Sequence, residues 1–221
     1  MLDRAVLKKL YYAFLLVRKG GFGILVRLFW SRVNSTISYV WLAKDLDPGE
    51  APGSAQIPYS LQSASPEAFR RILARLNGES GQDVFEILRR ISFYERGFDA
   101  CYLASTDSGD VCHVAWLLSV SHNDLIRSQY PAGMCKLEKD EVLLENIFTF
   151  PRYRSKGIMT SVTLLLANLA RKQGFRRVLA YVDIENKASL RAFLRVGFYY
   201  CGEEKERRRF FKIWRSWQSG K

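Results

Sequence analysis

The sequence lacks any run of about 18 residues without a charged side chain, which argues against a conventional membrane-spanning helix. It is also poor in groups that bind metals or form disulfides. Its four cysteines include no Cys-x-x-Cys pair, and neither His113 nor His122 has a neighbour at metal-ligand spacing. We therefore expect reduced thiols and no metal site. With 48% hydrophobic and 25% charged residues, the composition excludes wholesale disorder.

Positive charge is concentrated at the two ends of the chain, whose formal net charge is +12. Residues 1–45 hold eight Lys or Arg against two Asp, which gives +6. Residues 201–221 hold seven Lys or Arg against three Glu, which gives +4. Both segments would be attracted to an anionic surface, whether lipid, nucleic acid or a phosphorylated substrate. The alternative interpretation is ordinary solvated surface charge.

The first of these segments is amphipathic. Leu10 to Val17 is an apolar run, and on a helical wheel Leu7, Leu10, Tyr11, Phe14 and Val17 share one face. Aromatic and leucine side chains beside lysines are typical of a helix that lies in the bilayer interface. A helix packed on the protein's own core, or on a partner subunit, is the alternative.

The remaining sequence predicts a mixed α/β domain. Apolar runs and turn residues indicate strands, and 3.6-residue periodicity with capping residues indicates helices. We expect strands over 35–43, 57–61, 99–106, 111–121, 141–150, 177–184, 198–202 and 210–214, and helices over 65–76, 83–96, 157–173 and 187–196. The predicted organisation is a basic N-terminal segment over 1–45, a linker over 46–56 rich in proline, glycine and alanine, and an α/β domain over 57–221.

The most informative stretch is Phe150 to Thr160, where a strand ends, a basic turn follows and Gly157 opens a helix. A helix N-terminus has N–H groups without helical partners and a partial positive charge, and a phosphate can accept their hydrogen bonds. Glycine lets the phosphate approach the backbone closely. Arg152, Arg154 and Lys156 add charge, and hydroxyls follow in the first turn. The stretch therefore predicts a phosphate or pyrophosphate cradle, and it contains neither a Walker loop nor a Gly-x-Gly-x-x-Gly turn.

Two motifs resemble those of a known family. Arg154-Ser155-Lys156-Gly157-Ile158-Met159 is similar to the Arg/Gln-x-x-Gly-x-Gly/Ala pyrophosphate loop of the GNAT N-acetyltransferase superfamily. Asn186-Lys187-Ala188-Ser189, continued to Gly197-Phe198, resembles the family's second signature, in which an Asn after a strand precedes a short helix. One helix and one strand separate the two motifs, as in the family. The resemblance is specific over about 140–202 and weaker over the rest of 57–221.

The resemblance implies a mixed central sheet, splayed open between the strands at 141–150 and 177–184 and flanked by helices, with the N-terminal helix as an extension. Acetyl-CoA would be the co-substrate, with no metal. Its pantetheine arm would bind the backbone of Phe148, Thr149 and Phe150. The residues implied for the pyrophosphate are Arg154, Ser155, Lys156, Gly157, Ile158, Met159 and Thr160. Asn186 and Ser189 would lie near the pantetheine and the thiol.

The reaction needs a base for the amine proton and can use an acid for the leaving thiolate. Glu145 lies on the strand that borders the implied cleft, and we predict that it is the base that takes the amine proton. A structural carboxylate paired with an arginine is the alternative. Many family members have Tyr as the acid where this sequence has Phe193, so Ser189 or water would replace it, with Tyr199 or Tyr200 more remote. Met159 stands where the loop usually has a small residue, which narrows the approach to the phosphates.

These features predict an acyl-CoA-dependent N-acyltransferase, with acetyl as the acyl group and a primary amine as acceptor. The amine would be on a small molecule, an amino sugar or a peptide. The amphipathic segment favours an acceptor made at a membrane, such as a lipid- or nucleotide-linked amino sugar. A membrane-peripheral module that binds CoA without turnover is the alternative, supported by Met159 and Phe193. Nucleic acid binding through Arg207-Arg208-Arg209 and the aromatics after it is the least favoured function. We expect a cytoplasmic protein, with peripheral attachment to the inner face of the membrane as an extension, and leave the oligomeric state open.

Overall fold

The computed structural model describes residues 11–18, 23, 26, 30, 33–46, 55–76, 78–129, 136–210 and 212–219. The predicted apolar positions Leu7 and Leu10, most of the 46–56 linker and Cys135 lie outside these residues. The chain divides into two compact units. The first comprises residues 1–35, 65–97 and 208–212, and the second comprises 36–64, 98–207 and 213–221.

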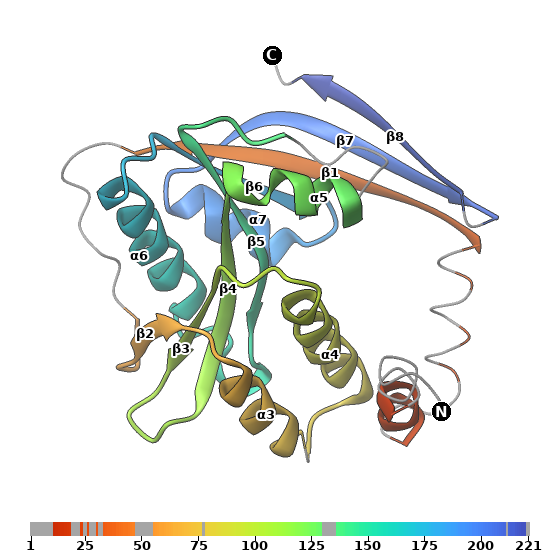
Figure 1. Cartoon of the computed structure of the whole chain (residues 1–221), viewed down its shortest axis with the longest axis vertical. Helices are drawn as coiled ribbons and strands as arrows, with labels where there is room; N and C mark the ends of the chain where they lie inside the picture. Colours follow the sequence, from red (N-terminus) through yellow and green to blue (C-terminus); the bar gives the residue numbers. More distant parts are fainter. Residues whose placement is uncertain are drawn as a thin grey trace. The chain divides into compact units, whose positions relative to one another are not determined.

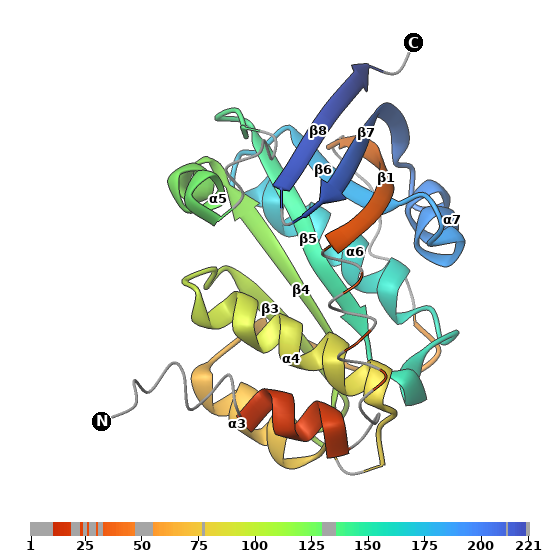
Figure 2. The same cartoon turned by 90° about the vertical axis from the view of Figure 1, so that its right-hand side faces the viewer.

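An eight-stranded mixed sheet dominates the second unit (Figure 1). Its strands are β1 (Asn34–Asp45), β2 (Ser60–Ser63), β3 (Cys101–Ser105), β4 (Val111–Ser119), β5 (Glu141–Thr149), β6 (Arg177–Asp183), β7 (Tyr199–Arg209) and β8 (Lys212–Ser219). The spatial order is β2-β3-β4-β5-β6-β1-β7-β8. Figure 2 shows the last four of these strands following one another across the sheet. The pair β5–β6 is parallel, whereas β2–β3, β3–β4, β4–β5 and β1–β6 are antiparallel.

Side chains alternate between the two faces of this sheet, and one face forms the main core. Val142 and Leu144 on β5, and Val178 and Ala180 on β6, are buried in one cluster with residues of the helix α6 (Ile158–Lys172). The residues between them, such as Leu143 and Leu179, point to the opposite face. Glu145 and Tyr181 follow the same alternation, so their side chains lie on the face away from α6.

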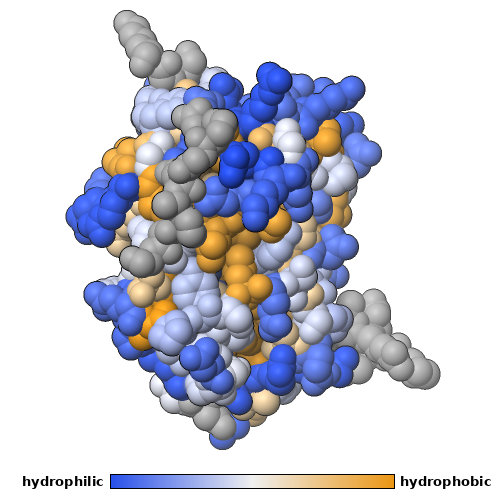
Figure 3. All heavy atoms as spheres, turned by 90° about the vertical axis from the view of Figure 1, so that its left-hand side faces the viewer, coloured by the Kyte–Doolittle hydropathy of each residue, from blue (hydrophilic) through white to orange (hydrophobic). Residues whose placement is uncertain are grey.

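Helix α7 of this unit begins where the sequence provides a cap. Asn186 caps α7 (Lys187–Arg195) by accepting a hydrogen bond from the Ser189 N–H at 3.1 Å. Helix α6 packs on β4, β5 and α7. On the side of the molecule that carries α6 in Figure 1, apolar side chains form a band between polar margins (Figure 3). Partly buried Leu164 and Leu169 of α6 pack at the edge of the core.

One helix is absent from the sequence prediction. Helix α5 (Asn123–Gln129) follows the short 3₁₀ turn Val120–His122. The Asn123 side chain donates to the Leu137 carbonyl at 2.9 Å and accepts from the Leu137 N–H at 3.0 Å. This short helix is thus held by a contact distant in sequence, which local pattern does not reveal.

The first unit contains three described helical segments: residues 11–18, α3 (Pro66–Ala74) and α4 (Gly81–Glu95). Ser65 and Ser80 cap α3 and α4, as expected of serine at these positions. Tyr12 donates a hydrogen bond to Glu95 Oε1 at 3.3 Å, and Leu16 is buried. The segment therefore packs on its own unit through one side.

The sequence placed several strand boundaries incorrectly. The strand expected over 57–61 is β2 at Ser60–Ser63, and the two closing strands are longer than expected. The segment predicted to end at residue 45 also contains β1, whose residues 39–45 pair with β6 inside the sheet. The domain boundaries remain predictions, but a shortened chain would have to begin before Asn34 to keep this strand.

The described residues include no helix that is long and apolar enough to cross a membrane. They also include no cluster of three His, Cys, Asp or Glu side chains suited to a metal. Cys101, Cys112 and Cys201 are free thiols, and burial raises the pKa of Cys112 to about 11, so that thiol stays protonated at neutral pH.

Candidate active site

The parallel strands β5 and β6 pair along only part of their length. Their register joins Glu141 to Arg177, Val142 to Val178 and Leu143 to Leu179, and no further pairs follow. Strand β5 nevertheless continues to Thr149, and β6 to Asp183. The two strands therefore part after Leu143 and Leu179, and we name the space between their free ends the wedge.

A β-bulge in β5 accompanies this separation. Trp116 on β4 pairs with Glu145 and Val114 pairs with Phe148, so β5 has one residue more than β4 between these pairs. Asn146 takes up the extra length with φ of 54°, in the left-handed region. Bulges bend the strand that carries them and increase its twist. The bulge thus turns the end of β5 relative to β6.

Backbone N–H and C=O groups at the end of β5 face either β4 or the wedge. The Phe150 N–H donates to the Cys112 carbonyl at 3.1 Å, and the Phe150 carbonyl accepts from the Tyr153 N–H at 2.9 Å. Because the direction of N–H and C=O groups alternates along a strand, Phe148 also faces β4, whereas Thr149 faces the wedge. Of the three residues expected to bind pantetheine, Thr149 is therefore the one whose backbone points to the open side.

The loop after β5 leads into the N-terminus of α6. Gly157 is the residue before the helix, with φ of 75°, and no side chain caps the first turn. Ser155 has φ of 61°, so the loop contains two left-handed residues. The Ile158 side chain is buried, which leaves its backbone as the group available to a ligand. The Thr160 hydroxyl donates to the Gly157 carbonyl at 2.8 Å and stabilises the turn.

Arg154 links this loop to the end of β5. Arg154 Nε donates to the Thr149 carbonyl at 3.1 Å, and its guanidinium lies 5.4 Å from the centre of the Phe148 ring. Lys156 Nζ lies 5.7 Å from the centre of the Tyr153 ring. The loop therefore holds two bases beside the wedge, as the pyrophosphate hypothesis requires.

Two other groups near the loop have structural partners. Arg152 lies 3.7 Å from Asp110 Oδ2, which draws its charge towards the β3–β4 turn. Ser161, expected to offer a hydroxyl in the first turn of α6, is buried and hydrogen-bonded to the Tyr59 hydroxyl at 2.6 Å. Burial raises the pKa of Tyr59, so this phenol stays neutral. Ser161 thus holds the segment before β2 against α6.

On the face away from α6, Glu145 and Tyr181 meet across the wedge. The Tyr181 hydroxyl donates to Glu145 Oε1 at 3.3 Å. The Tyr181 ring stacks on Trp41, with 5.2 Å between ring centres, and contacts Tyr39 edge to face at 5.3 Å. Trp41 Nε1 in turn donates to Glu204 Oε2 at 3.2 Å. The candidate base is therefore held by a tyrosine that is itself fixed by packing, and sequence reasoning did not identify that tyrosine.

The residues of the second motif follow β6, at the same end of the sheet as Thr149. Because β5 and β6 are parallel, their carboxyl ends lie at one edge, where ligands of open α/β sheets bind. Asn186 and Ser189 both belong to the first turn of α7, and the Asn186 side chain caps it. Phe193 is buried, with its ring edge to face against Phe198 at 4.9 Å between centres. It therefore belongs to the core.

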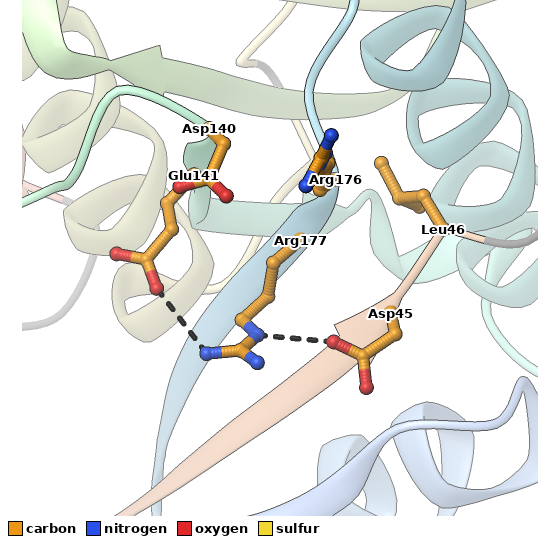
Figure 4. Close-up of a pocket in the computed structure, with 6 residues that line it drawn as sticks. All are labelled: Asp45, Leu46, Asp140, Glu141, Arg176 and Arg177. Carbon is orange, nitrogen blue, oxygen red and sulfur yellow. Dashed lines mark hydrogen bonds and ion pairs between the residues drawn. The ribbon is translucent and has the colours of Figure 1, made fainter.

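A polar cavity of about 500 Å³ lies at the other, closed end of the β5–β6 pair (Figure 4). Arg177 occupies its wall and reaches Asp45 Oδ1 at 3.0 Å and Glu141 Oε1 at 3.6 Å. The hydrogen bond from Arg177 lowers the pKa of Asp45. These ion pairs join β1, β6 and β5 where the strands are paired. The cavity is therefore remote from the wedge and is not the candidate active site.

Comparison with known proteins identifies the family. A sequence model of the acetyltransferase (GNAT) family matches residues 67–198. This match covers more than half of the 221 residues, and the protein belongs to this family. The predicted family and fold class are thereby confirmed. No curated protein matches the chain.

Solved structures share the fold at low sequence identity. A GCN5-related N-acetyltransferase from Sphaerobacter thermophilus is 15% identical, with a TM-score of 0.50, over 86% of this chain and 58% of that chain. A fungal multi-domain GH3 β-N-acetylglucosaminidase with a GCN5-related glucosamine N-acetyltransferase region is 14% identical, with a TM-score of 0.51, over 87% of this chain and 22% of that chain. The chain thus spans less than two thirds of the length of either relative, and the likeness is one of fold.

The residues beside the wedge fit acetyl-CoA, the co-substrate of this family. The uncapped amides after Gly157 suit the pyrophosphate, and Arg154 and Lys156 supply opposite charge. The backbone of Thr149 faces the open side; its carbonyl accepts from Arg154, and its N–H is the group it would offer to the pantetheine. All of these residues lie in the described part of the chain.

Proposed function

We propose that the protein transfers an acetyl group from acetyl-CoA to a primary amine. The observation that carries the proposal is the early end of the β5–β6 pairing at Leu143 and Leu179, beyond which β5 continues to the loop before the uncapped N-terminus of α6. An extended thioester with a diphosphate matches this geometry, because a strand edge and a phosphate cradle lie next to each other. The proposed ligands of CoA are Phe148, Thr149, Phe150, Arg154, Ser155, Lys156, Gly157, Ile158, Met159, Thr160 and Asn186. For Phe150, whose N–H and C=O already have partners, contact would be through the side chain.

In the proposed reaction, the neutral amine nitrogen attacks the thioester carbonyl carbon. A C–N bond forms and the C–S bond breaks, so the CoA thiolate leaves. Glu145 accepts the proton that the amine loses, directly or through one water. Tyr181 holds the Glu145 carboxylate on the acceptor face of the sheet. Ser189 is proposed to donate towards the departing sulfur, because Phe193 has no proton to give.

We propose an amino sugar as the favoured class of acceptor. Partly exposed Tyr39 and Tyr181 lie beside Glu145 on the face opposite α6. Aromatic rings are suitable surfaces for the apolar faces of sugars, and a carboxylate attracts the ammonium that must lose its proton. The glucosamine N-acetyltransferase region named above concerns that fungal protein, and it lends this choice only the support of a common fold.

The proposal is tested by calorimetry and by release of free thiol from acetyl-CoA. The full chain should bind CoA, and an amine panel that includes glucosamine, nucleotide-linked amino sugars and polyamines should release thiol in step with acetylated product. An Arg154→Ala variant should weaken CoA binding, whereas Arg70→Ala, which removes an exposed arginine of α3, should not. Absence of CoA binding would overturn the proposal. Tight binding without product for any amine would favour a CoA-binding module without turnover.

A further inference from the structure

The structure brings the two basic ends of the sequence together. The Phe210 N–H, in the turn between β7 and β8, donates to the Val33 carbonyl at 2.8 Å. Val33 directly precedes β1 and lies within the N-terminal basic segment. Residues 208–212 and residues 1–35 also belong to the same compact unit. Arg208, Arg209 and Lys212 of the C-terminal basic segment therefore belong to the same unit as residues 1–35.

The turn itself places an aromatic ring in water. Phe210 is 79% exposed, which is the highest exposure among the large hydrophobic residues that the structure describes. Its φ is 47°, in the left-handed region that bulky residues seldom adopt. The two-residue turn between β7 and β8 accounts for this backbone, because tight hairpin turns need positive φ. Such turns favour asparagine or glycine, so the turn does not account for a bulky ring that gains little from burial.

Basic residues flank Phe210 in the sequence. Arg208 and Arg209 precede it, Lys212 follows it, and residues 207–212 contain no acid. Arg209 and Lys212 are exposed. We name Arg208, Arg209, Phe210 and Lys212 the hairpin tip. It combines one projecting aromatic side chain with like charges around its base, which is the composition of segments that bind anionic lipid.

The N-terminal helical segment of the same unit presents apolar side chains too. Tyr11 and Phe14 are 52% and 60% exposed, while Tyr12 and Leu16 on the other side pack inward. One side of the helical segment therefore packs on its own unit, and the other side is exposed and could face a membrane. The two hypotheses for this segment are compatible.

We propose that the hairpin tip docks on an anionic lipid bilayer, with Phe210 entering the headgroup region and Arg209 and Lys212 contacting the lipid phosphates. A second copy of the chain is a poor occupant, since two tips of the same charge repel each other. Single-stranded nucleic acid needs several aromatic rings along one groove. The next described aromatics, Trp214 and Trp217, are three residues apart on β8 and so point to opposite faces of that strand.

This inference does not depend on acyl transfer, because none of the residues of the hairpin tip belongs to the wedge. A protein that never turns over acetyl-CoA could still bind lipid, and an active enzyme could fail to bind it. Lipid binding and thiol release are therefore separate measurements. If both hold, the bilayer is where the enzyme meets its acceptor.

The test is co-sedimentation of the full chain with vesicles of phosphatidylcholine alone or mixed with phosphatidylglycerol. We expect pelleting with the mixed vesicles only, and loss of pelleting at high salt. Arg209→Gln with Lys212→Gln should lower the partition coefficient about 25-fold, at about fivefold for each base removed. Phe210→Ser should lower it roughly tenfold, because a buried apolar ring is lost from the interface.

Matched controls remove the same chemistry elsewhere. Leu194→Ser removes an exposed apolar side chain from α7, and Lys139→Gln with Lys172→Gln removes two exposed bases. Neither should change the partition coefficient by more than about twofold. Circular dichroism confirms that each variant is folded. Undiminished vesicle binding in both hairpin-tip variants would overturn the proposal, as would binding to a labelled oligonucleotide in preference to the vesicles.

Discussion

The hydroxyl of Tyr181 lies 3.3 Å from Oε1 of Glu145, on two parallel strands that have already separated. In a fully paired sheet these side chains would be ordinary neighbours on adjacent strands. Here the hydrogen bond spans the wedge two residues beyond the last backbone pair. It fixes the carboxylate on the acceptor face, while the thioester would lie along the strand edge between them. This pair is the part of the site most directly open to test.

Replacing Glu145 with Gln should lower kcat by roughly a factor of 10² to 10⁴, which is the usual contribution of a general base. The KM for acetyl-CoA should remain within about threefold of the wild-type value, because the proposed CoA contacts lie on other residues. Steady-state thiol release over a range of pH is the measurement. Full activity of the Gln variant would remove Glu145 from the mechanism and leave the structural interpretation of this carboxylate.

Replacing Tyr181 with Phe tests positioning by a different readout. The ring and its stacking on Trp41 are retained, and only the hydrogen bond to Glu145 is lost. We expect kcat to fall by about tenfold or less. The rising limb of the kcat/KM profile should move to higher pH, since the ionised carboxylate loses a donor. Tyr39→Phe, which alters a neighbouring phenol in the same cluster, should leave the profile in place.

Replacing Gly157 with Ala should weaken CoA binding at least tenfold by calorimetry. The residue has φ of 75°, where an L side chain is strained, and a Cβ would project beside the amides of the cradle. Gly174→Ala is the matched control, because Gly174 has φ of 90° near the other end of α6 and open space for a Cβ. It should lose about 1 kcal/mol of stability in the same way and bind CoA normally. Equal loss of CoA binding in both variants would mean that the helix, rather than the cradle, is affected.

Much of this fold could be predicted because its signals are local. The apolar run of β6 and the Ser65-Pro66-Glu67 start of α3 each specify their element within a few residues. The loop before α6 was predicted from its strand, glycine and bases, and the structure has that order of elements. These features need no knowledge of what packs against them.

The remaining features depend on contacts between distant residues. The bulge at Asn146 exists only relative to β4, and Tyr181 becomes part of the site only because β6 parts from β5. Asn186 was assigned to the cofactor from its motif, yet its side chain also caps α7, a role that serine or aspartate could fill. Sequence spacing cannot separate a residue that caps a helix from one that binds a ligand.

Replacing Phe193 with Tyr should not improve catalysis, although many family members have Tyr there. The Phe193 side chain is 3% exposed and packs against Phe198. A hydroxyl added in this core would need a partner, and burying it without one costs about 1–3 kcal/mol. We expect a lower midpoint of urea unfolding and no increase in kcat. A rise in kcat with unchanged stability would show that position 193 reaches the leaving thiolate.

The last prediction concerns the support behind Tyr181. Glu204 accepts a hydrogen bond from Trp41, on which Tyr181 stacks, and its side chain also lies 3.3 Å from Arg215. Burial raises the pKa of Glu204 above its ordinary value, and the attraction of Arg215 only partly opposes this. An acid whose pKa is raised by folding stabilises the protein most below its unfolded pKa and loses that contribution as pH rises through the folded value.

The stability of the wild type relative to Glu204→Gln should therefore fall as pH rises from about 4 through the raised pKa of Glu204. Urea unfolding of both proteins across this range gives the difference directly. Glu203→Gln changes the neighbouring residue of β7, whose side chain pairs with Lys205 at the surface, and its difference from the wild type should stay small at every pH. If the stability of the wild type relative to Glu204→Gln instead increases as pH rises, the attraction of Arg215 lowers the pKa of Glu204 more than burial raises it. Glu204 would then hold Trp41, and through it Tyr181, as a favourable ionised anchor.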